Sequence, residues 1–218
     1  MKIFLDTADT DAIEKAYTTG IIDGVTTNPT LIRKSGRDPE EVYQQLIDYG
    51  INDISMEVVG DYNTMFEEGT RLSRKFGKAC TIKVPCTPDG LRVCRELSKD
   101  LVNVNVTLIF SAAQAILAAK SGAKYVSPFV GRVDDNSFVG MDLIEQISDI
   151  YTIQNVHKTE ILSASIRDVK SVSDSFASGA HVVTMPPTVF EKMYNHVLTD
   201  KGLQLFDADW ASVVSNTK

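Results

Sequence analysis

Several residue types and patterns that would each indicate a class of protein are scarce in this chain of 218 residues. It contains three cysteines, Cys80, Cys86 and Cys94, and no C-x-x-C pair. An odd number without that spacing argues against a disulfide framework and is typical of reduced thiols buried as small apolar groups. The three histidines are scattered along the chain. We therefore expect no metal site.

Long apolar runs and excess positive charge are also missing. No apolar stretch approaches the length of a membrane span, and residues 1–5 lead directly into a strand-like segment without a secretory signal. We therefore expect a cytoplasmic protein. The net charge of -7 argues against a broad nucleic-acid surface but leaves room for a local basic pocket that binds a small phosphate.

Short β-branched runs alternate with longer amphipathic stretches along the whole chain. The runs predict strands at Ile3–Leu5, Gly24–Thr26, Ile54–Val58, Thr81–Val84, Val102–Leu108, Tyr125–Phe129, Ile161–Ser163 and Val182–Met185. Eight strands in strict alternation with eight helices predict a single (β/α)₈ barrel domain over residues 1–218. A doubly wound open sheet is the alternative. It usually has fewer strands or a glycine-rich first turn, and no G-x-G-x-x-G or Walker sequence is present.

The predicted strands end in polar residues, which a barrel of this kind would gather at the rim that carries its active site. These residues, in chain order, are Asp6, Asn28, Glu57, Lys83, Thr107, Ser127 and Ser165. Each also has a structural interpretation. Asp6 could cap the first helix, Asn28-Pro29 could form a turn, and the hydroxyls of Thr107 and Ser127 could be satisfied locally. It is their convergence on one rim that favours a functional site.

Lys83 lies in the apolar run "TIKVP", where an ammonium group is costly to desolvate. Burial favours the neutral amine, which attacks a carbonyl to form an imine, and the imine then withdraws electrons from a neighbouring carbon–carbon bond. Carboxylates nearby, such as Asp6 and Glu57, can move the protons that this chemistry needs. Lys83 is therefore predicted to form a Schiff base.

Two arginines follow the sixth and seventh predicted strands. Arg132 lies in "SPFVGRVDD", and Ser165 and Arg167 lie in "SASIRD". Two guanidinium groups beside a hydroxyl suit a phosphate monoester. The alternative is that the arginines form surface ion pairs with Asp134, Asp135 or Asp168.

The segments "FLDTAD", "GVTTNPTLI", "IKVP", "NVTLIFSAAQAILAAKSGAKYVSPFVGRVDD" and "ILSASIRD" together resemble the small-subunit transaldolase family, which includes the fructose-6-phosphate aldolases. The match runs in order from Lys2 to about Trp210. The resemblance implies a (β/α)₈ barrel that forms imines with ketose phosphates and needs no metal or cofactor.

The resemblance also implies a role for each matching position. Lys83 would form the Schiff base, Asp6 would act on the C4 hydroxyl, and Glu57 with Thr107 would hold the water that shuttles protons. The remaining matching positions would contact substrate: the three-carbon donor fragment would meet Thr26, Asn28 and Ser127, and the phosphate would meet Arg132, Ser165 and Arg167.

Two positions separate the branches of this family. The aldolases, which release free dihydroxyacetone, have glutamine at the position of Glu57 and tyrosine at that of Phe129. This sequence has the residues of the transaldolases, which keep the fragment on the lysine until an aldose phosphate accepts it. Transaldolase is therefore the leading prediction, fructose-6-phosphate aldolase the second, and a non-catalytic phosphosugar-binding barrel the third.

An additional helical tail is predicted at residues 199–218, where "LQLFDADWASVV" is amphipathic. Phe206 and Trp210 would be exposed there unless they pack on their own barrel. The resemblance implies instead that the tail reaches a neighbouring subunit in a ring-shaped homo-oligomer, a pentamer or decamer.

Overall fold

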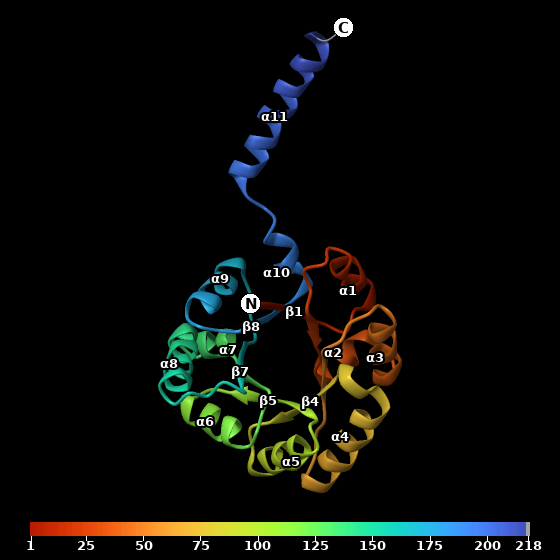
Figure 1. Cartoon of the computed structure of the whole chain (residues 1–218), viewed down its shortest axis with the longest axis vertical. Coiled ribbons are helices and arrows are strands. Elements are labelled where there is room, and N and C mark those ends of the chain that lie inside the picture. The colour runs from red at the N-terminus through yellow and green to blue at the C-terminus, as the bar shows by residue number, and fades with distance from the viewer. Residues whose placement is uncertain (217–218) are drawn as a thin grey trace.

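A closed barrel of parallel strands forms the centre of the molecule (Figure 1). The computed structural model describes residues 1–216, and this part of the chain contains eight strands paired in sequence order, with β8 closing against β1. They are β1 (Lys2–Asp6), β2 (Gly24–Thr26), β3 (Ile54–Glu57), β4 (Cys80–Pro85), β5 (Asn103–Ile109), β6 (Tyr125–Pro128), β7 (Glu160–Ser163) and β8 (Val182–Met185). The predicted (β/α)₈ fold is confirmed, and no strand bound differs from its prediction by more than one residue.

The helices other than α11 lie around the barrel. Within residues 1–216 the helices are α1 (Thr10–Tyr17), α2 (Pro29–Ser35), α3 (Pro39–Asp48), α4 (Tyr62–Phe76), α5 (Pro88–Lys99), α6 (Ala112–Lys120), α7 (Val130–Asp135), α8 (Gly140–Ile153), α9 (Val169–Ala177), α10 (Pro187–Lys192) and α11 (Val197–Asn216), with a 3₁₀ turn at Gly77–Ala79. The expected strict alternation is wrong at two places, because β2 and β6 are each followed by two helices.

The two short additional helices, α2 and α7, lie in loops that the sequence analysis left unstructured. In α2 the side chain of Asn28 accepts a hydrogen bond from the Leu31 N–H, Pro29 occupies the first turn, and Gly36 ends the helix with a left-handed φ of 67°. These are ordinary helix start and stop signals compressed into seven residues. In α7, the helix start is held by the chain after β7, which accepts from the Val130 and Gly131 N–H groups.

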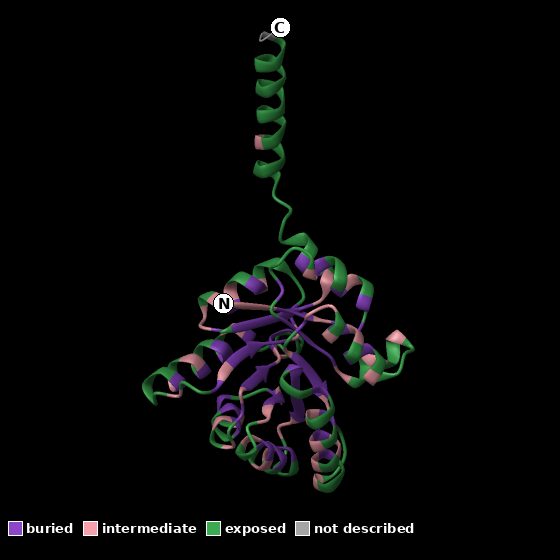
Figure 2. Ribbon diagram, turned by 45° about the vertical axis from the view of Figure 1, so that its right-hand side comes forward, coloured by how far each residue is buried: buried purple, intermediate pink, exposed green. Residues whose placement is uncertain are grey.

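Alternation along the strands divides the barrel interior into layers. Phe4, Tyr125, Leu162, Ala164 and Val182 form a separate apolar cluster, within which Phe4 and Tyr125 meet edge to face at 5.9 Å between ring centroids. Two residues further along β1, β6 and β8 come Asp6, Ser127 and Thr184. The apolar cluster is therefore the floor beneath the carboxyl ends of the strands. Figure 2 shows the buried strands at the centre and the exposed faces of the helices outside.

A carboxylate closes the opposite, amino-terminal end of the barrel. Asp53 accepts hydrogen bonds from the Thr81 hydroxyl, the Lys124 ammonium and the Tyr125 hydroxyl, each at 2.8 Å. Burial and the charge of Asp53 raise the pKa of Tyr125, so its hydroxyl keeps the proton that it donates. This network links the starts of strands β4 and β6 to Asp53, the residue before β3.

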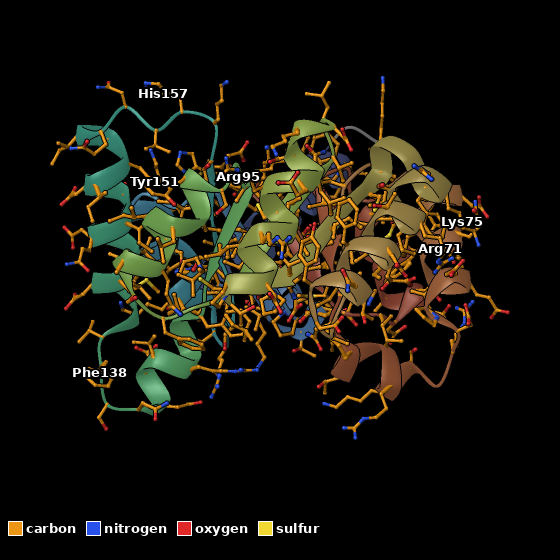
Figure 3. The ribbon with its side chains drawn as sticks, turned by 90° about the horizontal axis from the view of Figure 1, so that it is seen from below. Arg71, Lys75, Arg95, Phe138, Tyr151 and His157 are labelled. Carbon is orange, nitrogen blue, oxygen red and sulfur yellow. The ribbon has the colours of Figure 1, made fainter. Side chains whose placement is uncertain are left out.

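On the outer surface, Glu40 of α3 pairs with two cations of α4, Arg71 at 2.5 Å and Lys75. Arg71 and Lys75 lie side by side at the edge of the molecule (Figure 3). The two cations hold the pKa of Glu40 at about 2, against an ordinary value of 4.5. The pairs connect neighbouring helices around the barrel.

Helix α11 extends away from the barrel (Figures 1 and 2). Phe206 is 71% exposed and Trp210 is 68% exposed, so neither packs on its own barrel. The last two residues of the predicted tail, 217 and 218, lie outside the described residues. Among residues 1–216, no helix has the length and apolar character of a membrane span.

Candidate active site

The carboxyl ends of the strands surround a cavity of about 100 Å³. Its lining residues are Asp6, Thr26, Asn28, Lys83, Ser127, Phe129, Arg132, Leu162, Ala164, Ser165 and Thr184. All predicted site residues except Glu57, Thr107 and Arg167 line it. Barrel closure therefore brings together residues that are spread over most of the sequence.

Lys83 lies on β4 with only 4% of its surface exposed. Its Nζ lies 3.0 Å from Glu57 Oε2 and donates a hydrogen bond of 2.9 Å to the Thr27 carbonyl. Glu57 is the register partner of Lys83 on β3, which is why the two side chains meet. The ammonium that looked costly in the sequence is thus compensated by a carboxylate and a carbonyl. The same contact gives Glu57 a direct route for a proton to or from the amine.

Asp6 ends β1 and belongs to the cavity, not to the helix that follows it. The cap of α1 is Asp9, whose side chain accepts from the Asp11 and Ala12 N–H groups, so the capping interpretation of Asp6 is wrong. Asp6 Oδ1 instead accepts a hydrogen bond of 2.8 Å from the Thr26 hydroxyl. Burial raises the pKa of Asp6, and the charge of Lys83 and the bond from Thr26 act in the opposite direction. A buried carboxyl with a raised pKa beside a lysine is a candidate for accepting and returning a proton during a reaction.

Thr107 is only 1% exposed, and its hydroxyl has no hydrogen-bond partner among the described residues. It pairs in register with Pro85 at the end of β4, two residues after Lys83 and therefore on the same face of the strand. The alternative that its hydroxyl is satisfied locally is therefore wrong among the described residues. A buried hydroxyl without a protein partner is a natural place for a bound water.

Asn105 is a site residue that the sequence analysis missed. It is fully buried on β5, where it pairs in register with Lys83. Its Oδ1 accepts a bond of 2.7 Å from Ser127, and its Nδ2 donates to Ser55 at 3.1 Å. The signal was available, because in "NVNVTLIF" Asn105 and Thr107 alternate with apolar residues and so share a face. Asn105 fixes the direction of the Ser127 hydroxyl.

Thr184 of β8 was also missed. It lines the cavity, is 2% exposed, and its hydroxyl oxygen lies 2.7 Å from that of Thr26. The sequence analysis credited only the first seven strands with polar rim residues. In "VVTM" the threonine is flanked by apolar residues, as Glu57, Lys83 and Thr107 are in their strands.

Asn28 has both a structural role and a place in the cavity. Its Oδ1 caps α2 through the Leu31 N–H at 3.0 Å, so the structural role of Asn28 is that of a helix cap and not the predicted turn. It also lines the cavity. Because the carbonyl oxygen of the side chain serves the helix, the two amide N–H donors are the part left for a ligand.

The two arginines lie at the same side of the cavity but have different partners. The guanidinium of Arg132 lies over the Phe129 ring, 4.8 Å from its centroid, and lines the cavity. Arg167 donates two hydrogen bonds to Asp135, at 2.7 and 2.5 Å. The surface-pair alternative therefore holds for Arg167 with Asp135, and the pair is about half exposed.

Close backbone packing places Ser165 and Arg167 against α7. A Cβ at Gly131 would come within 2.2 Å of the Ser165 carbonyl oxygen and 2.8 Å of Arg167 Nε. Only glycine permits this approach. Ser165 itself has a φ of 61°, a strained value for a residue with a side chain. The loop after β7 is thus held tightly against α7, so that Arg132 and the Ser165 hydroxyl line this side of the cavity and Arg167, paired with Asp135, lies behind them next to Gly131.

Comparison with known proteins shows the family of this chain. The family model described as "Transaldolase/Fructose-6-phosphate aldolase" matches residues 3–217. A "Probable transaldolase" of Paracoccus denitrificans (strain Pd 1222) is 53% identical over 212 residues, which covers 97% of each chain. A "Probable transaldolase" of Nitrosopumilus maritimus (strain SCM1) is 49% identical over 214 residues, covering 98% of this chain and 96% of the relative. Another from Ruegeria sp. (strain TM1040) is 51% identical over 210 residues, covering 96% of each. The chain therefore belongs to the transaldolase/fructose-6-phosphate aldolase family.

Proposed function

We propose that this family member is a transaldolase of the class that works through a lysine Schiff base. It would transfer a dihydroxyacetone unit from a ketose phosphate, sedoheptulose 7-phosphate or fructose 6-phosphate, to an aldose phosphate, glyceraldehyde 3-phosphate or erythrose 4-phosphate. The observation that carries the proposal is the contact of Lys83 with Glu57 at 3.0 Å in the barrel whose cavity also holds Asp6. These are one nucleophile and two proton-transfer groups.

The reaction begins at Lys83. Glu57 takes a proton from the ammonium, and the free amine attacks the ketone carbon of the donor. Glu57 and a water held with Thr107 then move the protons that turn the carbinolamine hydroxyl into water, which leaves as the protonated imine forms. The buried and unpartnered hydroxyl of Thr107 supports this role.

Cleavage follows at the bond between C3 and C4 of the donor. Asp6 removes the proton of the C4 hydroxyl, the C3–C4 bond breaks, and its electron pair moves into the imine to give an enamine on Lys83. The aldose phosphate leaves. A second aldose phosphate enters, the enamine carbon attacks its aldehyde, and Asp6 returns its proton to the new hydroxyl. Hydrolysis of the imine releases the new ketose phosphate. No metal or cofactor enters these steps.

The remaining cavity residues would hold the substrate in register with Lys83. Thr26, Asn28 and Ser127 are proposed to bind the hydroxyls of the donor fragment, because they are neutral hydrogen-bonding groups lining the cavity with the lysine. Arg132, Ser165 and Arg167 are proposed to bind the phosphate at the side of the cavity where α7 meets the loop after β7. Two cations and a hydroxyl fit a phosphate monoester.

Phe129 and Glu57 support transfer over release. Phe129 packs against Phe110, with ring centroids 5.8 Å apart, and against the Arg132 guanidinium. It thus presents a ring without a hydroxyl to the cavity, so it offers no group that would protonate or hydrate the bound three-carbon fragment. We expect the fragment to stay on Lys83 until an acceptor arrives. We place this activity in the cytoplasm and in the pentose phosphate pathway, where these sugar phosphates are interconverted.

The decisive measurement is the release of glyceraldehyde 3-phosphate from fructose 6-phosphate, with and without erythrose 4-phosphate. A transaldolase releases it catalytically only when the acceptor is present. Equal release without acceptor would mean an aldolase that frees dihydroxyacetone. Lys83→Ala should abolish turnover and the adduct that borohydride traps with the wild-type protein. Retained phosphate-ester binding without any wild-type adduct would mean a non-catalytic binding barrel.

We also propose that residues 1–218 form one barrel domain whose tail, residues 199–218, docks on a neighbouring copy in a pentamer or decamer. A helix that extends into solvent with most of its apolar side chains exposed gains little from packing, and tertiary packing is the main source of helix stability in proteins. Phe206→Asp should therefore dissociate the oligomer in sedimentation experiments. Ile153→Asp, which alters a side chain equally exposed at 72% on α8, should not.

A further inference from the structure

Strand β8 contributes one polar side chain to the cavity, that of Thr184. It pairs in register with Phe4 on β1, while Asp6 pairs with Thr26 on β2. Because β1 lies between β8 and β2, the two threonine side chains meet above it, next to Asp6. The three oxygen atoms form a chain, with 2.7 Å from Thr184 to Thr26 and 2.8 Å from Thr26 to Asp6.

The direction of the hydrogen bonds in this chain follows from counting protons. An ionised carboxylate can only accept, so the single hydroxyl proton of Thr26 is committed to Asp6. The bond between the threonines must then be donated by Thr184 to the Thr26 oxygen. Both threonines are 2% exposed, so solvent offers little alternative. Thr184 is therefore the group that fixes the rotation of the Thr26 hydroxyl.

We propose that Thr184 is a positioning residue for the reaction, which acts on Asp6 through Thr26 and keeps the carboxylate ionised and aimed at the reacting hydroxyl. This inference rests on the proposed role of Asp6 as the acid/base. It assigns to β8 a function that neither the strand-end pattern nor the family resemblance indicated.

Loss of the Thr184 hydroxyl should act on Asp6 and not on Lys83. Burial already raises the pKa of Asp6, and the bond from Thr26 is one of the two effects that restrain it. The other is the charge of Lys83. The charged groups around the cavity, Lys83 with its partner Glu57 and Arg132, are all unchanged by a substitution at Thr184. Weakening the Thr26 bond should thus shift only the protonation of Asp6.

The test is the substitution Thr184→Val, which keeps the shape of the side chain and removes the hydroxyl. A hydrogen bond of this kind is worth about 1 kcal/mol, so kcat at neutral pH should fall about fivefold. The acid limb of the kcat/KM profile should move up by roughly half a pH unit. The borohydride-trapped adduct should form as in the wild type, because imine formation uses Lys83 and Glu57. Thr184→Ser, which restores the donor, should restore the profile.

Thr81→Val is the matched control. Thr81 is also a buried barrel threonine that donates to a carboxylate, that of Asp53 at 2.8 Å, but it lies at the opposite end of the barrel. It should lower stability without moving the pH profile. The inference is overturned if the Thr184→Val profile superimposes on the wild type, or if Thr184→Ser behaves like Thr184→Val.

Asp6→Asn separates this inference from the proposed function. It should remove turnover while the trapped adduct still forms. Unimpaired turnover in Asp6→Asn would overturn the proposed role of Asp6 together with the inference. Loss of turnover in Asp6→Asn beside a wild-type profile in Thr184→Val would overturn the inference alone.

Discussion

Replacing Glu57 by glutamine removes the counter-charge of Lys83 and keeps the size of the side chain. The side chains of the pair are 6% and 12% exposed, and their charged atoms lie 3.0 Å apart. At an effective dielectric constant of about 20, this separation corresponds to an attraction of about 5 kcal/mol. After the substitution, the ammonium keeps its bond to the Thr27 carbonyl, but no other carboxylate of residues 1–216 lies within ion-pair distance of it.

The expected loss of stability is smaller than that attraction, because desolvation of both charges opposes it in the native protein. Removing one partner of a buried pair costs about 3–5 kcal/mol, and the pair here borders a cavity that admits water, so we expect about 2–3 kcal/mol for Glu57→Gln. Lys83→Met should cost a similar amount, since it leaves the carboxylate unpaired. The double variant should lose less than the two single variants added together, by about 2 kcal/mol.

Urea unfolding followed by circular dichroism, at one fixed protein concentration, measures this coupling across the four proteins. The exposed pair of Glu96 and Lys99 on α5 is the control, and the same cycle there should show no measurable coupling. Additivity within about 0.5 kcal/mol for Glu57 and Lys83 would refute the reasoning. Under the proposed function, Glu57→Gln should also slow the formation of the trapped adduct by about 100-fold.

Three further predictions concern other parts of the molecule. Phe129→Tyr should raise acceptor-independent release of glyceraldehyde 3-phosphate from fructose 6-phosphate, and an unchanged ratio of release without and with erythrose 4-phosphate would contradict the role given to the ring. Glu40→Gln should lower stability by about 1 kcal/mol or less at pH 7, since the two cations that pair with it are about half exposed to solvent. The pKa of Glu40 in the folded protein lies below its ordinary value of 4.5, so this stabilisation is complete above pH 4.5 and is lost as the pH falls toward about 2. The difference in melting temperature between the wild type and Glu40→Gln should therefore be smaller at pH 3.5 than at pH 7. An equal difference at both pH values would refute the linkage. Asp135→Asn should lower KM for sugar phosphates by up to about fivefold, because a half-exposed carboxylate no longer competes for Arg167. KM for donors without a phosphate group should stay unchanged. A raised KM for the sugar phosphates would mean that Asp135 orients Arg167 instead.

The barrel could be predicted because short β-branched runs, typical of strands, alternate with longer amphipathic stretches, typical of helices, along the whole chain. Each β-branched run is short and is followed by a helix with readable signals, such as Asp38 before Pro39, where the Asp38 side chain caps α3 as expected. The short helices α2 and α7 were not predicted because six or seven residues do not establish a helical period. Asn28 and Pro29 carried the start signal of α2, but the same dipeptide also indicates a turn.

The candidate site could be predicted as far as strand ends and residue types allow. Knowing that parallel strands end at one rim was enough to place Asp6, Lys83 and Ser127 around the same cavity. The partner of each side chain could not be read in the same way. The path of the loops at the rim decides two of these partners. It makes Asp9, and not Asp6, the cap of α1, and it brings Arg167 to Asp135. The spacing of residues in the sequence does not determine the path of a loop.

Asn105 and Thr184 show why a rim contains more than its strand-terminal residues. A lysine in an apolar strand demands an explanation, whereas Thr107 and Ser127 stood out only as polar residues near the ends of their predicted strands. Yet a charged group inside a barrel acts only through the neutral groups that orient it. The proton of Thr26 can serve Asp6 because Thr184 supplies the second bond, and Ser127 is held in direction by Asn105. Such neutral residues are buried, small and β-compatible, so in sequence they look like ordinary strand residues. Barrel closure, which brings β8 beside β1, is the first level at which their role becomes visible.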